Sequence, residues 1–142
     1  MRIKQLSLFL ENRNGSVNAV CQVLKQNKIN IKTLSLADTQ QFGILRLLVQ
    51  NPEECKVILE KAGFVVKVTE VLALLVPDHP GGLADILAIL DRHQLAIEYM
   101  YAFTFGREDQ AVIVFRFENP ELAVKELKHE PITILRAEEL FQ

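Results

Sequence analysis

The stretch LALLVPDHPGGLADILAIL, residues 72–90, joins an apolar strand to an amphipathic helix through a Gly-Gly turn. Residues 72–76 are all apolar and few in number, which favours a strand buried on both faces over a helix. Proline cannot donate to a sheet and biases the residue before it away from the helical region, so Pro77 and Pro80 end the strand in a tight loop. Gly81 and Gly82 let the chain turn without a Cβ, and apolar residues then recur at helical spacing, at Leu83, Ile86, Leu87 and Leu90.

The turn exposes the N-terminal end of the predicted helix. The first four N–H groups of a helix have no partner within it and carry the positive end of the helix dipole. Such a turn can bind a carboxylate or a phosphate. An ordinary strand-loop-helix corner, with water on those N–H groups, remains the alternative.

Composition and charge limit the function classes. The chain has 142 residues, 49% hydrophobic and 24% charged, as in a globular protein with one domain or two small ones. A net charge of −2, with Lys and Arg dispersed along the chain, argues against binding to nucleic acid or an anionic membrane. No apolar run approaches about 20 residues and the N-terminus lacks a signal-peptide pattern, so we expect a cytoplasmic protein without a membrane span.

The sequence repeats itself, and the repeat decides the fold. Residues 12–17 (NRNGSV) align with residues 78–83 (DHPGGL), 66 positions later, and residues 28–31 align with residues 94–97 at the same offset. Residues 51–53 match residues 119–121 at an offset of 68, so two residues have been inserted between them. Insertions belong in surface turns, and the simplest place is the turn at residues 106–110.

Each copy has the same order of elements. In the first copy we predict strands over residues 3–10, 29–37, 43–49 and 64–71, with a bulge or bend near Lys32 and Thr33 where the apolar alternation changes phase. Its helices cover residues 16–27 and the segment between Asn51, as N-cap, and Gly63. In the second copy we predict strands over residues 72–76, 95–105, 110–118 and 132–138, and helices over residues 82–93 and 120–128.

This order predicts an α+β fold of two ferredoxin-like βαββαβ units in tandem, over residues 1–70 and 71–142. Right-handed crossovers place the first and third strands of each antiparallel sheet centrally, with both helices on one face. The last strand of the first copy is expected to continue into the second copy without a linker.

An aromatic stripe marks a strand expected at a sheet edge. Tyr99, Tyr101, Phe103 and Phe105 alternate onto one side, with Met100 and Ala102 on the other. We expect most of the stripe to form core beneath the helices, because aromatic residues are found in cores far more often than in ligand sites. Apolar edges and uncovered sheet faces invite pairing, so we expect the two copies to join edge to edge or the chain to form a homodimer.

The motif Asp78-His79-Pro80-Gly81-Gly82-Leu83, the helix after it and then Leu95-Ala96-Ile97-Glu98 resemble the ACT domain of amino-acid-sensing regulatory proteins. The first copy resembles it less closely, because Asn14 replaces the usual proline. The resemblance implies domains that pair edge to edge. It also implies that an amino acid or related small molecule binds where the strand-to-helix loop of one domain meets the second strand of its neighbour.

Carried over by position, the resemblance implies two ligand sites. The first-copy site comprises Asn12, Asn14, Gly15, Ser16 and Val17, with Ile31 as a facing wall; the second comprises Asp78, His79, Pro80, Gly81, Gly82 and Leu83, with Ile97 and Glu98 as facing walls. The residue chemistry agrees, because three backbone N–H groups in each turn could bind a carboxylate. Asp78, or Asn12 as its neutral counterpart, could accept from an ammonium group. As an alternative, each of these two side chains only caps its own loop.

No motif indicates catalysis. Phosphate, dinucleotide and zinc signatures are absent, and no basic aromatic strand motif of an RNA-recognition module occurs. Cys21 and Cys55 lack metal-ligand spacing and are expected to be reduced and buried. His79 is expected to line a ligand pocket rather than act as a base. We therefore predict a protein that is not an enzyme and needs no cofactor or metal: an amino-acid sensor or, alternatively, an interaction module without a ligand site.

Overall fold

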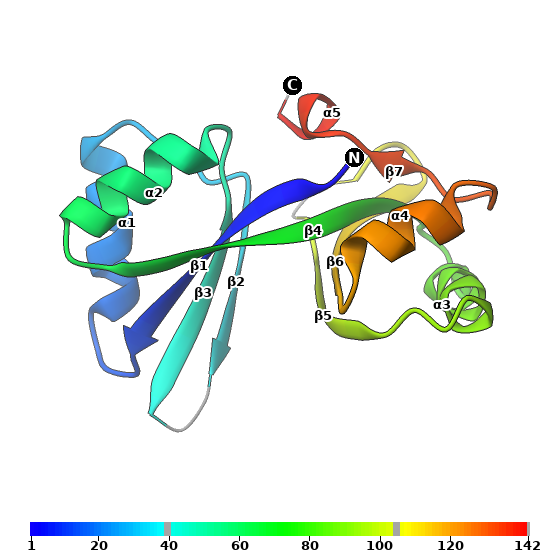
Figure 1. Ribbon diagram of the computed structural model, residues 1–142. Coiled ribbons are helices and arrows are strands. Elements are labelled where there is room, and N and C mark those ends of the chain that lie inside the picture. The colour runs from blue at the N-terminus through cyan, green and yellow to red at the C-terminus, as the bar shows by residue number, and fades with distance from the viewer. Residues whose placement is uncertain (39–40, 104–105, 142) are drawn as a thin grey trace. The chain divides into compact units, whose positions relative to one another are not determined.

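A computed structural model describes residues 1–38, 41–103 and 106–141 (Figure 1). These residues form two compact units. The first unit is Lys4–Thr69, and the second unit is Met1–Ile3 with Glu70–Gln142. Each is an antiparallel sheet with two long helices on one face, so the predicted tandem α+β architecture is confirmed. The predicted boundary after residue 70 falls within a strand and stays a prediction.

In the first unit the strands have the order β2-β3-β1-β4. The elements are β1 (Ile3–Glu11), α1 (Ser16–Gln26), β2 (Thr33–Asp38), β3 (Phe42–Leu48), α2 (Pro52–Lys61) and the start of β4 (Val65–Pro77). The first and third strands are central, as predicted. Leucine side chains from β1 and β3 pack against Val20, Leu24 and Leu59 of the helices.

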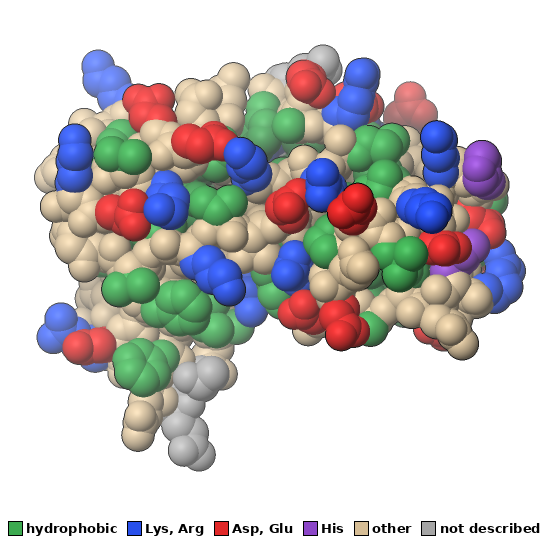
Figure 2. Space-filling model, viewed as in Figure 1, with side chains coloured by type: hydrophobic (Ala, Val, Ile, Leu, Met, Phe, Trp, Pro, Cys, Tyr) green, Lys and Arg blue, Asp and Glu red, His purple; other side chains and the backbone are tan. Residues whose placement is uncertain are grey.

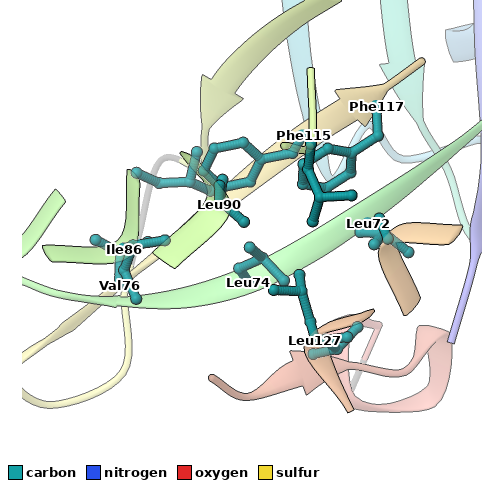
Figure 3. Close-up of a cluster of buried hydrophobic side chains, with 12 residues drawn as sticks. Leu72, Leu74, Val76, Ile86, Leu90, Phe115, Phe117 and Leu127 are labelled. Carbon is teal, nitrogen blue, oxygen red and sulfur yellow. The ribbon is translucent and has the colours of Figure 1, made fainter. Parts of the chain in front are cut away.

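Strand β4 runs from the first copy into the second without a break. Its second half forms a sheet in the order β5-β6-β4, with β7 also paired to β4. The second-unit elements are α3 (Gly82–Arg92), β5 (Ile97–Ala102), β6 (Gln110–Phe117), α4 (Pro120–Leu127), β7 (Ile134–Leu135) and α5 (Ala137–Leu140). The core lies between this sheet and helices α3 and α4, where Leu72, Leu74, Ile86, Leu90, Phe115 and Leu127 meet (Figure 3).

Tyr99 and Tyr101 of the aromatic stripe are not core beneath the helices, and for these two residues the prediction was wrong. Tyr99 lies opposite Arg116 and Tyr101 opposite Val114, whereas the helix-facing Phe115 lies opposite Met100. Opposite residues in a sheet share a face, so the two tyrosines lie on the face without helices. The cause is a register shift after Ile97, which moves the later residues to the other face. Phe103 is buried, and Phe105 lies outside the described residues.

Strands β2 and β7 are shorter than predicted. The chain bends at Lys32, so β2 begins at Thr33, and the Ile29 N–H instead closes the end of α1 by donating to the Leu24 carbonyl at 2.9 Å. The predicted last strand is reduced to two residues before α5 begins. There the Glu139 carboxylate accepts from the Arg136 N–H at 3.1 Å and caps a short helix.

The surface seen in Figure 2 shows Lys and Arg side chains interspersed with Asp and Glu. Within the described ranges, none of the helices has the length and apolarity needed to cross a bilayer.

Candidate functional site

The second-unit corner between β4 and α3 is tightly closed. Gly81 has a φ of 88°, in the left-handed region that favours glycine. The Gly82 N–H donates to the His79 carbonyl at 2.9 Å. A Cβ added at Gly82 would lie 1.9 Å from the Pro77 carbonyl oxygen, so only glycine fits this backbone.

The first-unit corner between β1 and α1 repeats this geometry with different side chains. Gly15 has a φ of 90°, and the Ser16 N–H donates to the Arg13 carbonyl at 3.3 Å. Ser16 occupies the position of Gly82, so here the backbone leaves room for a Cβ. Asn14 occupies the position of Pro80, and all the residues from Asn12 to Gly15 are exposed.

Two of the six backbone N–H groups predicted to bind a carboxylate are used within the turns themselves, those of Gly82 and Ser16. For Gly15, Val17, Gly81 and Leu83, the described part of the chain supplies no hydrogen-bond acceptor to the N–H group. These four groups remain available to a ligand at the positive ends of α1 and α3.

The predicted acceptors behave differently in the two corners. The Asp78 side chain is exposed, and its backbone N–H donates to the Asp109 carbonyl at 2.7 Å. The Asn12 amide donates from Nδ2 to Asp38 Oδ1 at 2.8 Å, so the first corner also holds a carboxylate. Asp38 was missed by sequence analysis because it lies on β2, far along the chain from the loop. The His79 ring contacts its own loop, with Nδ1 3.0 Å from the Pro80 carbonyl.

A cavity of about 340 Å³ opens at the first-unit corner. The end of β1, the start of α1 and the turn from α2 into β4 line it, and its wall includes Arg13, Asn14, Gly15, Ser16, Phe64 and Val65. Its volume is in the range of small-molecule sites. The sequence did not identify the turn from α2 into β4 as part of the site.

The predicted facing walls do not meet the corner of their own unit. Ile97 at the start of β5 lies opposite Phe117 at the end of β6, whereas Pro77 at the corner lies opposite Gln110 at its beginning. The corner and Ile97 are therefore at opposite ends of the sheet. The Glu98 carboxylate lies 3.5 Å from Arg116 Nε. Ile31 likewise lies at the opposite end of the first-unit sheet from its corner. It precedes β2, whose first residue, Thr33, lies opposite Leu48, the last residue of β3.

The described residues contain no group of three or more His, Cys, Asp and Glu side chains that could hold a metal ion. Cys55 is buried, and burial raises the pKa of its thiol to about 11. Cys21 is partly exposed, in contrast to the prediction that both cysteines are buried.

The repeated glycine corner and tandem fold match a known family. A family model described as an ACT domain pair covers residues 1–142. The chain belongs to the ACT domain pair family. ACT domains are regulatory modules that bind amino acids, and the expected resemblance is confirmed.

This ACT domain pair is similar to solved structures and to a curated protein. Protein BT0572 from Bacteroides thetaiotaomicron is 36% identical, with coverage of 100% of this chain and 97% of that chain and a TM-score of 0.91. The ligand-free regulatory subunit of aspartate kinase from Thermus thermophilus is 14% identical, with 98% and 93% coverage and a TM-score of 0.63, which shows a shared fold. The acetolactate synthase small subunit of Buchnera aphidicola subsp. Baizongia pistaciae is 32% identical over 77 residues, 50% of this chain and 48% of that protein. The match thus spans about half the length of this curated relative.

Proposed function

We propose that this ACT domain pair is a non-catalytic regulatory protein that binds an amino acid at its strand-to-helix glycine corners. The observation that carries the proposal is the first-unit corner, where Gly15, whose N–H group is available, lines a cavity of about 340 Å³. The ligand carboxylate binds the N–H groups of Gly15 and Val17, or of Gly81 and Leu83 in the second corner. Its ammonium group binds an acidic side chain, for which Asp78 is placed at the second corner.

The remaining predicted residues enter the proposal through a neighbouring ACT domain. Ile31, Ile97 and Glu98 lie at the opposite sheet end from their own corner, so they can only wall a site that belongs to another domain. A second copy of the chain in a homodimer is the candidate. The two loops are shaped by the other predicted residues, not all of which contact the ligand: Asn12, Asn14, Ser16, His79, Pro80 and Gly82.

A thermal-shift screen of the full chain against the 20 proteinogenic amino acids tests this proposal. A ligand that binds only the folded state stabilises it by about 1.4 kcal/mol at ten times its Kd, which raises Tm by a few degrees. We expect a saturable rise with at least one amino acid. The absence of any rise at millimolar concentrations would contradict the proposal.

A second candidate function is a protein interaction module without a ligand. The observation in its favour is the exposed side of the edge strand β2, where Leu34 and Leu36 are 42% and 56% exposed. Apolar residues on an edge strand promote pairing with another chain. This candidate predicts self-association that depends on Leu34 and Leu36, together with a Tm that no amino acid changes.

A further inference from the structure

The cavity at the first-unit corner combines apolar walls with a pair of opposite charges. Phe9 and Val65 line it and are 44% and 65% exposed, so their apolar surface is open to a ligand. At the same cavity, Arg13 Nε lies 3.2 Å from Glu11 Oε2. A ligand with one apolar group and two opposite charges would cover Phe9 and Val65 with its apolar group and bind Arg13 and Glu11 through its charges.

The second-unit corner lacks the pair of opposite charges. At the aligned positions, Pro77 replaces Glu11, His79 replaces Arg13 and Asp85 replaces Ala19. Asp85 places a carboxylate in the first turn of α3, whereas the first turn of α1 has no acidic residue. An acidic side chain there offsets the charge of the helix end and repels a ligand carboxylate.

We propose that the first-unit corner is the amino-acid site and selects apolar side chains, while the second-unit corner has a structural role. The inference rests on the proposed function and assigns it to one copy. The ligand carboxylate, bound to the N–H groups of the corner, also binds the Arg13 guanidinium, the ammonium group binds the Glu11 carboxylate, and the side chain covers Phe9 and Val65. A charged ligand side chain would be buried against these apolar residues without a partner, which disfavours it.

Isothermal titration calorimetry of the full chain tests the inference. We expect one site per chain for leucine, valine or phenylalanine, and aspartate and lysine at least tenfold weaker. 4-Methylpentanoate and 3-methylbutylamine each lack one of leucine's two charges and should also bind at least tenfold more weakly, because each loses a charge-assisted hydrogen bond.

Variants separate the roles of charge and size. Arg13→Gln should weaken leucine binding about tenfold. Ala19→Asp, which copies the second corner, should weaken it at least threefold, whereas Ala19→Asn should not, because it adds similar volume without charge. Arg136→Gln is the matched control, because Arg136 is also exposed and paired with a nearby carboxylate, that of Glu139, at 3.2 Å. Circular dichroism checks that each variant is folded.

The outcomes distinguish this inference from the function on which it rests. No binding by any amino acid would contradict both. A preference for charged amino acids, or leucine binding unchanged by both Arg13→Gln and Ala19→Asp, would overturn the inference and leave the proposed function standing. Selective apolar binding weakened by both variants supports the first-unit site.

Discussion

The substitution Gly82→Ala tests the geometry of the second-unit corner. The added Cβ would lie 1.9 Å from the Pro77 carbonyl oxygen and 2.8 Å from its carbonyl carbon. These are backbone atoms at the end of β4, where Pro77 lies opposite Gln110, so no flexible side chain can move aside. Overpacking typically costs about 1–3 kcal/mol, and a backbone obstacle places this case at the upper end. Alanine favours a helix over glycine by at most about 1 kcal/mol, so we expect the free energy of unfolding to fall by about 2 kcal/mol in total.

Two further variants separate steric conflict from backbone strain. Gly81→Ala adds a Cβ with no atom within 4 Å, so it should cost only the strain of a left-handed alanine, about 1–2 kcal/mol. Ser16→Ala, at the matched position in the first unit, should change stability by less than about 0.5 kcal/mol. The assay is urea unfolding followed by circular dichroism and tyrosine fluorescence. Both tyrosines are in β5, so the fluorescence reports on the second unit. The reasoning fails if Gly82→Ala is as stable as the parent chain.

Two other predictions concern titration. The carboxylates of Glu130 and Glu126 lie 2.9 and 3.1 Å from the His93 ring nitrogens and raise the pKa of His93 above its ordinary value of 6.5. The stabilisation of the folded state by the contacts between His93 and these carboxylates is therefore fully present below about pH 6.5. It is lost as pH rises through the folded-state pKa of His93. We expect His93→Asn to lower Tm at about pH 5.5 but not at about pH 9; an equal loss at both would exclude the charged pair. The Cys55 thiol is buried and has a pKa of about 11. We therefore expect a thiol reagent at about pH 8 to label Cys21 in the folded protein and Cys55 only after unfolding. Equal labelling rates for the two cysteines would contradict this.

The repeat made most of the fold predictable. Gly15 and Gly81 have φ values of 90° and 88°, and Lys28 and Gln94, also 66 positions apart, have values of 55° and 54°. Similar sequence at a constant offset imposes the same local backbone on both copies, so the order of elements followed from one well-defined stretch. The strand-to-helix corner was predictable because its glycine requirement is local.

Features that depend on contacts distant in sequence were not predictable. The register shift after Ile97 reverses the faces of Tyr99 and Tyr101, and alternation alone carries no sign of it. Phe64, in the turn before β4, and Asp38, at the end of β2, reach the first-unit corner only because the fold brings these segments near it. The second corner matches the motif more closely, yet Gly82 there lies so near the Pro77 carbonyl group that a Cβ has no room. The motif itself does not indicate this close approach.

The most direct test of the central claim is a ¹H–¹⁵N correlation spectrum of the full chain, titrated with leucine. The claim is that a glycine corner supplies free N–H groups to an amino-acid carboxylate. We expect saturable shifts centred on the amide signals of Gly15 and Val17. Unchanged amide signals at both corners, Gly15 and Val17 in the first and Gly81 and Leu83 in the second, at saturating or millimolar ligand would contradict it.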